Sequence, residues 1–281
     1  MYNDSFRKRY KSAPVAISEN TEPYDTPAHI HREIELLFIK EGKAEITVSD
    51  RHYFVSEGDV VIVNPMDVHL IKADITKPYH QRCICFDSSL IADKNLREGL
   101  LSANMSILEL HSKNVECTNI ITKLFDLLFE SVSENSDELF LESVAYISLI
   151  FVNLKKRGMI SAKKSSAKKI NFERKLQDYL SEHFSEQITS QTVSKELFYN
   201  QSYFCRVFRE NFGVSFLEYL TLYRISCAKL MLSSEDIRIS DVAERVGFLD
   251  ASYFSRCFKK IIGISPVEYQ KRQSSAHTKS I

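Results

Sequence analysis

The chain has 281 residues, enough for two domains of ordinary size, and 44% of them are apolar, enough for packed cores. Its formal charge is zero at pH 7, but Lys and Arg exceed Asp and Glu after residue 157 and the reverse holds before it, so the C-terminal part suits phosphate. The six cysteines lack metal-finger spacing, and no apolar run could serve as a signal core or cross a bilayer, so we expect a cytoplasmic protein with free thiols and no membrane partner.

Residues from Pro27 to about Phe86 alternate in the two-residue rhythm of β-strands. Short apolar runs are separated by EGK, SDR and SEGD, which are typical turn sequences. Six such runs favour a small barrel or sandwich. The stretch from Ala28 to Ile39 predicts one strand with a polar and an apolar face. The first face carries His29, His31, Glu33, Glu35, Leu37 and Ile39, and the second carries Ile30, Ile34, Leu36 and Phe38. We expect the His and Glu side chains to point into a cavity and helices to cover the apolar face.

The segment HIHREIELLFIKEG has the pattern HxH, three residues, E, six residues, G, and resembles the first motif of the cupin superfamily. The second cupin motif is imperfect, because in GDVVIVNPMDVHLI the proline is one residue late, Asp67 replaces a glycine and one spacer residue is missing. In cupin enzymes the matching residues bind a divalent metal, whereas regulators with this barrel use them for a small organic effector. The resemblance implies effector binding, without a metal or other cofactor, by His29, His31, Glu35 and His69. A metal site and a structural histidine network remain the alternatives.

Residues 111–157 predict two helices. TNIITKLFDLLFESV has one apolar stripe, while the helix that follows has apolar residues widely around its circumference, at Leu141, Val144, Ile147, Leu149, Ile150 and Val152. An apolar surface this broad must pack against two separate partners. The barrel can supply one, and we expect a second subunit to supply the other and form a homodimer; the alternative is that both helices only cap their own barrel. The Ser/Lys-rich residues 158–169 predict a flexible linker.

Residues 170–272 contain one sequence unit twice. SYFCRVFRENFGVSFLEY begins at Ser202, and SYFSRCFKKIIGISPVEY begins at Ser252 and aligns with it without a gap. In each unit a short helix, a turn and a second helix are expected, and the turn of the first unit is one residue shorter. Gly247 provides the open backbone of the second turn, and Asn200 and Asp250 are the expected N-caps of the two second helices.

The second helix of each unit has an outward face that suits the major groove of DNA. This face carries Ser202, Cys205, Arg206 and Arg209 in the first unit, and Ser252, Ser255, Arg256 and Lys259 in the second. Short side chains let a helix approach base edges, and Arg offers a two-donor fork that fits guanine. A connecting helix over residues 219–234 would place the two reading helices about one DNA turn apart, ~34 Å.

With GFLDASYFSRCFKKIIGISPVEY at its end and AKLML between the units, this part resembles the DNA-binding domain of AraC/XylS transcription regulators. Such regulators commonly carry a cupin-like barrel, so the two resemblances support each other. The resemblance implies an activator that binds double-stranded DNA, acts with RNA polymerase and responds to a small-molecule effector, for which a sugar is the first candidate. It implies base contacts from Ser202, Cys205, Arg206, Ala251, Ser252, Ser255 and Arg256. Ser194 stands where the family usually has Ala.

The sequence therefore predicts a multidomain α and β chain that is a regulator and not an enzyme. We expect a cupin-like effector-sensing β-barrel with an N-terminal arm at 1–110, a helical dimerisation segment at 111–157, a linker at 158–169, an all-α double helix-turn-helix domain at 170–272 and a disordered tail at 273–281. Two rivals stay open. A metal-dependent cupin enzyme would leave the C-terminal repeat unexplained, and a DNA-binding regulator with a purely structural barrel would be controlled by its abundance.

Overall fold

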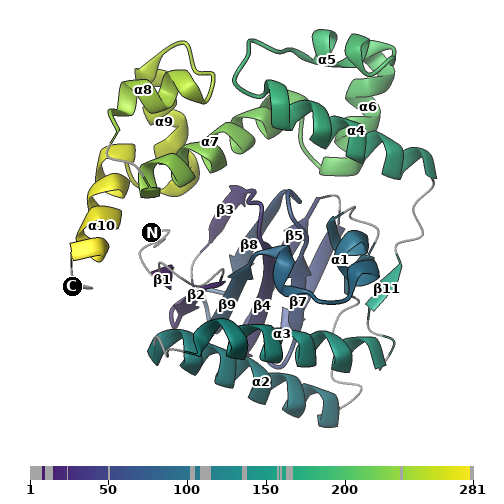
Figure 1. Cartoon of the computed structure of the whole chain (residues 1–281), viewed down its shortest axis with the longest axis vertical. Helices are drawn as coiled ribbons and strands as arrows, with labels where there is room; N and C mark the ends of the chain where they lie inside the picture. Colours follow the sequence, from purple (N-terminus) through teal and green to yellow (C-terminus); the bar gives the residue numbers. More distant parts are fainter. Residues whose placement is uncertain are drawn as a thin grey trace.

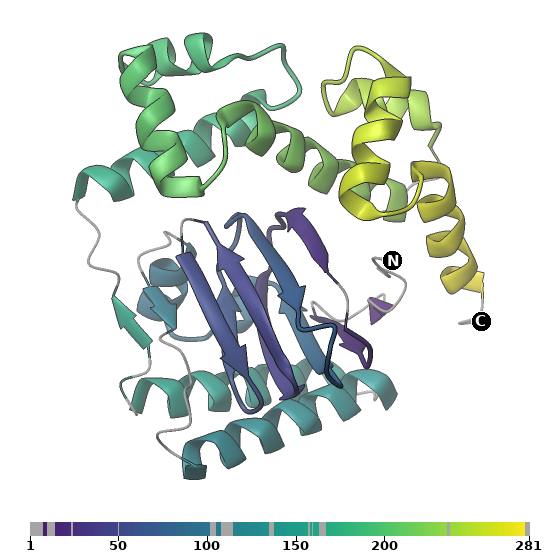
Figure 2. The same ribbon diagram turned by 180° about the vertical axis from the view of Figure 1, so that it is seen from behind.

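The computed structural model of the chain describes residues 8–9, 15–23, 25–49, 51–101, 105–107, 115–134, 138–156, 158, 160–162, 167–234 and 237–278. Figures 1 and 2 show two parts, with the strands and their covering helices on one side and the C-terminal helices arched across one end of the strands. Residues 159 and 163–166 of the predicted linker, and residues 279–281 of the predicted tail, lie outside the described residues.

Two antiparallel sheets form the N-terminal part, with strand orders β1-β2-β9-β4-β7 and β3-β8-β5-β6. Between them Leu37, Ile46 and Val63 are fully buried in one apolar cluster, so the prediction of a small barrel or sandwich is confirmed. The strands are β1 (Lys8–Arg9), β2 (Val15–Asn20), β3 (Thr26–His29), β4 (Ile34–Glu41), β5 (Lys43–Val48), β6 (Arg51–Ser56), β7 (Val60–Val63), β8 (His69–Ala73) and β9 (His80–Phe86). A separate pair, β10 (Met105–Ile107) and β11 (Ile160–Ala162), lies outside these sheets.

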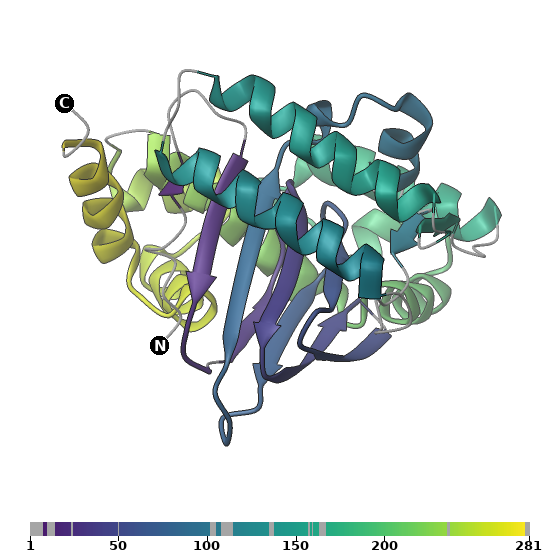
Figure 3. The same cartoon turned by 90° about the horizontal axis from the view of Figure 1, so that it is seen from below.

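Strand β4 has the two faces that its alternation predicts. Ile34, Leu36 and Phe38 point away from the interior and are buried in a second cluster with α2 (Val115–Glu134) and α3 (Leu139–Lys156). Figure 3 shows these two helices lying across the five-stranded sheet. Full burial of an aliphatic or aromatic side chain contributes about 1.5–3 kcal/mol, so this face fixes the position of the helices on the sheet. The opposite face of β4 directs Glu35 and Leu37 inward.

The stretch from Ala28 to Ile39 is not the one continuous strand that the alternation predicts. It forms β3 and β4, which belong to different sheets, and the residues between them carry the chain from one sheet to the other. The carbonyl of His31 accepts a hydrogen bond from Met66 N at 2.8 Å, and Ile30 packs with the C-terminal helices instead of beside Ile34. Alternation of polar and apolar residues indicates which side chains share an environment, but it does not show where the backbone turns.

The C-terminal part consists of helices that share one buried apolar cluster. Helix α7 runs between two helix pairs, α5 with α6 at one end and α8 with α9 at the other (Figure 2). The predicted arrangement of two helix-turn-helix units joined by a helix is confirmed. The bounds are α4 (Ala167–His183), α5 (Ser190–Glu196), α6 (Gln201–Phe212), α7 (Phe216–Ser234), α8 (Ile239–Arg245), α9 (Ala251–Ile262) and α10 (Pro266–Thr278), and the N-terminal part adds η2 (Ser88–Leu90) and α1 (Lys94–Leu101).

The ends of the C-terminal part differ from the predicted boundaries. Helix α4 begins at Ala167, inside the predicted linker, and α10 continues to Thr278, into the residues 273–281 for which the sequence predicts a disordered tail. Ser265 caps α10 by accepting a hydrogen bond from Glu268 N at 3.2 Å, and Pro266 takes the first helical position. No Gly or Pro follows before Thr278, so the sequence has no local stop signal. Within the described ranges, the helices are too short or too polar to cross a membrane.

Candidate functional site

The first helix-turn-helix consists of α5 and α6. Asn200 is the N-cap of α6, as predicted, and its side-chain oxygen accepts a hydrogen bond from Ser202 N at 2.9 Å. Phe204 and Phe208 are fully buried, which fixes the inner face of α6. The opposite face is exposed and carries the predicted DNA-contact residues Ser202, Cys205, Arg206 and Arg209.

The second helix-turn-helix consists of α8 and α9. Asp250 is the predicted N-cap and accepts a hydrogen bond from Tyr253 N. Gly247 has a φ of +88°, and a Cβ at this position would lie 2.5 Å from Ser185 O, so the turn requires glycine. Ala251, Ser252, Arg256 and Lys259 are exposed, while Ser255 is half-buried and donates its hydroxyl to Ala251 O at 2.8 Å. Ser255 is therefore the least available of the predicted contact residues.

Many of the residues that recur in the two units are those that build each unit. In both copies two phenylalanines are fully buried, a tyrosine is buried in the helix that follows, and a serine caps that helix; these residues are Phe204, Phe208, Tyr219 and Ser215, and Phe254, Phe258, Tyr269 and Ser265. The repeat is thus a repeat of packing and capping. Among the exposed positions, Ser202, Tyr203 and Arg206 recur as Ser252, Tyr253 and Arg256. Cys205 and Arg209 correspond to Ser255 and Lys259, so the two outward faces differ at these positions.

Each predicted arginine lies over a tyrosine one helical turn before it. Arg206 Cζ is 5.5 Å from the centre of the Tyr203 ring, and Arg256 Cζ is 5.8 Å from the centre of the Tyr253 ring. Both tyrosines are exposed. A cation over a ring face is attracted to it, and this restricts the guanidinium to a smaller set of orientations. These tyrosines are absent from the predicted contact residues, although their recurrence at i, i−3 in both units is a readable signal.

The connecting helix has a length that suits two adjacent grooves. Helix α7 has 19 residues, which corresponds to about 28 Å at 1.5 Å per residue. The helices α6 and α9 pack at its ends. This length is close to the ~34 Å repeat of one DNA turn once the widths of the attached helices are added.

The first unit departs from the second at two positions in and before its turn. Ser194 is buried, but its hydroxyl donates to Gln191 O at 3.0 Å, so the serine in place of the usual alanine is accommodated. Phe198 occupies the position that corresponds to Gly247, has a φ of +62° and is 91% exposed. A bulky residue in the left-handed region is strained, so the first turn is locally less stable than the second.

In the N-terminal part the structure brings together all four predicted effector-binding residues. His29, His31, Glu35 and His69 are buried, and we call them the His/Glu cluster. One donor atom from each residue lies within 4.8 Å of the others, a set that could hold a metal ion. His31 Nε2 lies 2.5 Å from Glu35 Oε2, and the His29 and His69 ring centres are 4.0 Å apart. The residues come from β3, the turn after it, β4 and β8.

The three imidazoles of the His/Glu cluster are held in the same way. Nδ1 of His29 donates to Pro27 O at 2.9 Å, Nδ1 of His31 to Glu33 O at 3.0 Å, and Nδ1 of His69 to Asp67 O at 3.0 Å. A carbonyl oxygen can only accept, so each Nδ1 carries a proton. In a neutral imidazole the lone pair then lies on Nε2. The backbone around each ring thus leaves Nε2 as the nitrogen that faces the other members of the cluster.

Glu35 is the acidic member of the His/Glu cluster. Burial alone would raise the pKa of this carboxyl, but contacts with His31 and His69 outweigh burial and hold the pKa well below its usual range. Cys83 Sγ donates to Glu35 Oε1 at 3.1 Å and Cys85 Sγ to Glu35 Oε2 at 3.4 Å. These cysteines are absent from the predicted site residues, because their position depends on the register that pairs Glu35 with Cys85 across β4 and β9.

The His/Glu cluster lies directly beside the contact between the two parts of the chain. Ile30, next to His29 and His31, and Val68, next to His69, are buried in the apolar cluster of the C-terminal helices. Tyr219 of α7 donates its hydroxyl to Met66 O at 3.1 Å. Arg32 donates to the Tyr223 hydroxyl at 3.2 Å. The backbone that carries the histidines therefore also contacts α7.

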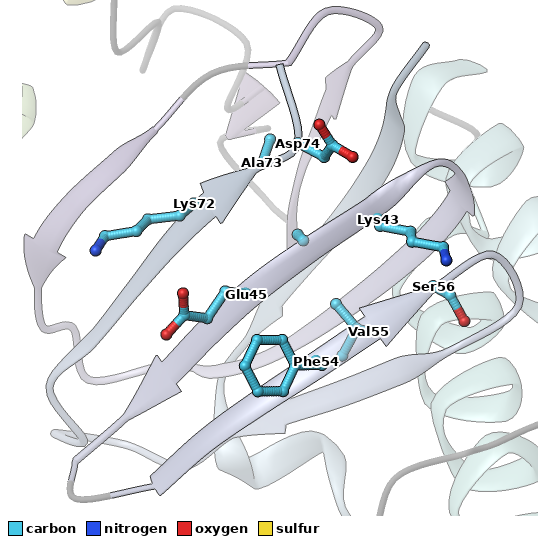
Figure 4. A pocket seen from close by; sticks show the side chains of 9 residues that line it. Lys43, Glu45, Phe54, Val55, Ser56, Lys72, Ala73 and Asp74 are labelled. Atoms are coloured by element: carbon cyan, nitrogen blue, oxygen red, sulfur yellow. The ribbon is translucent and has the colours of Figure 1, made fainter. Parts of the chain in front are cut away.

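A shallow pocket lies elsewhere, on the outer face of the four-stranded sheet (Figure 4). Its lining includes Lys43, Glu45, Phe54 and Lys72, whose side chains stand on strands β5, β6 and β8. Phe54 is 72% exposed. This surface has mixed charges on a solvated face and does not include the His/Glu cluster, so it does not bear on the predicted effector residues.

Two family models match the chain, in the order in which the two parts occur. The model described as the AraC-like ligand binding domain matches residues 13–148, and the model described as a helix-turn-helix domain matches residues 193–272. The first covers the sheets with their covering helices, and the second covers both helix-turn-helix units from within α5 onward. The ligand-binding model thus matches the part that contains the His/Glu cluster, and the helix-turn-helix model matches the part that contains α6 and α9.

Similar proteins are transcription regulators. The chain is 22% identical over 248 residues to the HTH-type transcriptional activator RhaS of Escherichia coli, an alignment that covers 85% of this chain and 86% of RhaS. It is 27% identical over 230 residues to the uncharacterized HTH-type transcriptional regulator YisR of Bacillus subtilis, with 77% and 78% covered. These relatives are regulators and not enzymes, which agrees with the non-enzymatic interpretation of the sequence.

Solved structures with the same overall fold include ToxT from Vibrio cholerae. One ToxT structure is 16% identical with a TM-score of 0.60, covering 94% of this chain and 99% of ToxT. A second, with a bound unsaturated fatty acid, is 17% identical with a TM-score of 0.57, covering 94% and 96%. At this identity the likeness establishes the fold alone, a β-sandwich with covering helices followed by a helical domain.

Proposed function

Because the chain belongs to the AraC family of DNA-binding transcription regulators, we propose that it is an activator whose barrel binds a small-molecule effector and whose α6 and α9 read DNA. The observation that carries the DNA part is the pair of exposed, basic helix faces at the two ends of α7. The observation that carries the effector part is the buried His/Glu cluster beside the contact with α7. The regulator would act in the cytoplasm, where its DNA lies.

We assign sequence reading to the outward faces of α6 and α9. Their residues are Ser202, Cys205, Arg206, Arg209, Ala251, Ser252, Ser255, Arg256 and Lys259. Arg206 and Arg256 suit guanine edges, the serines and alanine permit close approach, and Arg209 and Lys259 suit phosphates. Because the two helices differ where Cys205 and Arg209 correspond to Ser255 and Lys259, the operator is expected to contain two different half-sites about one turn apart.

A homodimer is the expected functional form. Helix α3 presents Leu141, Leu149 and Val152 on one exposed stripe, with 69%, 46% and 44% of each side chain accessible, while Ile147 and Ile150 pack inward. Large exposed apolar side chains in a row favour a protein contact. A second copy of α3 is the partner that the interpretation of residues 111–157 predicts, and the two subunits would then occupy neighbouring operator sites.

The effector and the direction of regulation follow from the family by analogy. A sugar is the first candidate from the sequence, and one ToxT structure contains an unsaturated fatty acid. Activation implies contact with RNA polymerase bound beside the operator. A second candidate function, a DNA-binding regulator controlled only by its abundance, would make the barrel structural.

Genome-wide mapping of bound sites in cells, combined with transcript measurement, tests this function. Wild-type protein should occupy a small set of promoters whose transcription falls when the gene is deleted, and Arg206→Ala with Arg256→Ala should lose these sites. Candidate sugars and fatty acids are then added while a bound promoter is monitored. A response in the wild type that is absent in Glu35→Gln supports effector binding. Transcription that follows protein abundance alone, under all conditions, would establish the structural-barrel alternative instead.

A further inference from the structure

We propose that Phe198 and Leu249, the exposed apolar side chains in the two helix-turn-helix turns, contact the C5-methyl groups of thymines at the edge of the half-site that each unit reads. They thereby add to base selection by the polar faces of α6 and α9. The inference rests on the proposed function, because it requires these two helices to enter the major groove. It deepens that function by naming a base that the turns select.

Phe198 stands outside the packed interior on a strained backbone. Its φ is +62°, which is unfavourable for a bulky residue, and its side chain is 91% exposed. The residues on either side pack inward, since Leu197 is buried and the ring centre of Tyr199 lies 5.5 Å from that of Phe172. The strain at Phe198 is therefore not offset by packing of its ring. Residues held in strained conformations cluster at functional sites.

Leu249 does not make the contact that an apolar residue at its position commonly makes. It directly precedes the N-cap Asp250, and an apolar residue there often packs against the fourth residue of the helix, which is Phe254. Phe254 packs instead against Phe248, whose ring centre is 5.2 Å away, and Leu249 is 86% exposed. Each turn thus has one aromatic residue that packs inward and one apolar residue that projects into solvent.

Both side chains lie beside the start of a reading helix. Leu249 is two residues before Ala251, the first residue of α9. Phe198 is three residues before Gln201, the first residue of α6. Because an extended chain spans at most ~3.6 Å per residue, these separations are at most about 7 and 11 Å. The first residues of the reading helix contact base edges in a helix-turn-helix, so the two apolar side chains lie at the edge of the surface that enters the groove.

The major groove offers one apolar group that suits a single apolar side chain. Thymine presents its C5-methyl group there, whereas the edges of the other three bases are marked by hydrogen-bond donors and acceptors. Apolar side chains, Phe among them, contact this methyl group in protein–DNA complexes. A leucine or phenylalanine at the start of a reading helix therefore favours thymine over the other bases at the position it covers.

The isolation of the two side chains favours DNA over a protein partner. Their exposed neighbours in the sequence are polar or charged: Lys195, Glu196 and Asn200 around Phe198, and Arg245 and Asp250 around Leu249. Protein contacts use contiguous apolar patches of several residues. One apolar side chain among polar ones instead matches one methyl group in a polar groove.

Replacement of thymine by uracil tests the contact on the DNA side. The full-length wild-type protein first selects its operator from random duplexes, and each thymine of the enriched sequence is then replaced in turn by uracil, which pairs in the same way and lacks only the methyl group. Burial of one methyl-sized group contributes ~0.8 kcal/mol, which corresponds to about 4-fold in affinity. We expect a loss of this size at one thymine in each half-site, measured by fluorescence anisotropy at one fixed salt concentration.

Two variants test the contact on the protein side. Phe198→Gly should bind the thymine operator about 4-fold more weakly and lose nothing further when its thymine becomes uracil, and Leu249→Ala should behave in this way at the other half-site. Glycine accepts a positive φ and Leu249 is exposed, so both variants should fold. The matched control is Phe54→Ala, which removes a 72% exposed ring from β6 and should keep the wild-type difference between thymine and uracil.

The inference is overturned if both variants keep the wild-type difference between the thymine and uracil operators, or if every thymine can be replaced without loss. In either case an enriched operator leaves the proposed DNA-reading function standing. If the difference is kept while transcription from a bound promoter falls in the variants, the two side chains contact a protein such as RNA polymerase, and the thymine contact is refuted. If no sequence is enriched, the proposed DNA reading itself fails and the inference fails with it.

Discussion

Replacement of Arg256 by Ala tests whether the outward face of α9 reads bases or only contacts phosphate. Arg256 is exposed and lies 5.8 Å from the centre of the Tyr253 ring. Its removal leaves the buried Phe254 and Phe258 in place, so the fold should be retained. A bidentate contact to a guanine edge is worth about 1–3 kcal/mol, which corresponds to a loss of roughly 5- to 150-fold in specific affinity.

Fluorescence anisotropy with operator and scrambled duplexes, at one fixed salt concentration, measures this loss. Fixed salt is required because phosphate contacts make all affinities depend on ionic strength. Lys271→Ala, which removes a positive charge from α10, is the control for net charge. Tyr253→Leu removes the ring under the guanidinium and should cost about 0.5–1 kcal/mol on the operator, the value of an exposed cation–π contact.

The outcome that refutes the base-reading assignment is an equal loss on both duplexes. In that case Arg256 contacts phosphate, the ratio of specific to non-specific affinity is unchanged, and the salt dependence falls by about one ion. If Arg256→Ala loses affinity only for the operator, while Lys271→Ala loses the same amount of affinity for both duplexes, base reading is supported.

Three further predictions concern stability and assembly. Phe198→Gly should raise the free energy of unfolding by about 0.5–1 kcal/mol in urea titration, because it removes the strain of a left-handed backbone. Gly247→Ala should lower the free energy of unfolding, since a Cβ there would lie 2.5 Å from a backbone oxygen. A loss of stability in Phe198→Gly contradicts the strain argument. Hydrogen bonds from the serine that caps α7 hold the pKa of Glu218 below its usual value, so its contribution, about 0.5 kcal/mol after solvent screening, is present above the unfolded pKa and disappears as pH falls through the folded pKa. Unfolding curves of the wild type and Glu218→Gln should therefore differ at pH 7 and converge in acid, and a constant difference across pH speaks against this role. Leu149→Asp should convert the dimer to a monomer in sedimentation, while Phe54→Asp on the outer face of β6 should not, and dimers that persist in Leu149→Asp place the interface elsewhere.

Local signals in the sequence predict the parts of the fold that depend on neighbouring residues. Asn200 and Asp250 are N-caps as expected, because capping requires only a short side chain and a helix start. The two faces of β4 follow from alternation, which places Glu35 on the inner face, and the pairing of β3 with β8 sets His29 opposite His69. Each of these features depends on a few neighbouring residues or on one pair of strands, so the sequence pattern predicts it.

The parts that escape prediction depend on residues far apart in the chain. The turn between β3 and β4 is set by Met66 N, and the contact of Arg32 with Tyr223 joins the two parts of the structure. Cys83 and Cys85 reach Glu35 only through the register of β4 with β9. Helix α10 extends because no Gly or Pro ends it, whereas the polar composition of the residues after Tyr269 alone favours disorder. None of these features has a local signature.

The alternation at the ends of β3 and β8 places the buried cluster and the contact with the C-terminal helices on opposite sides of the same backbone segments. Successive residues at these strand ends point in opposite directions, so His29 and His69 face the cluster while Ile30 and Val68 face the C-terminal helices. A shift of the histidines cannot occur without a shift of their sequence neighbours, because both lie on the same short backbone segments. The side chains on the far side are closely packed, and packed contacts resist gradual deformation. Under the proposed function, ligand binding in the cluster would act on α7 as a choice between two arrangements, and the difference in the ligand's affinity for the two would set the size of the response.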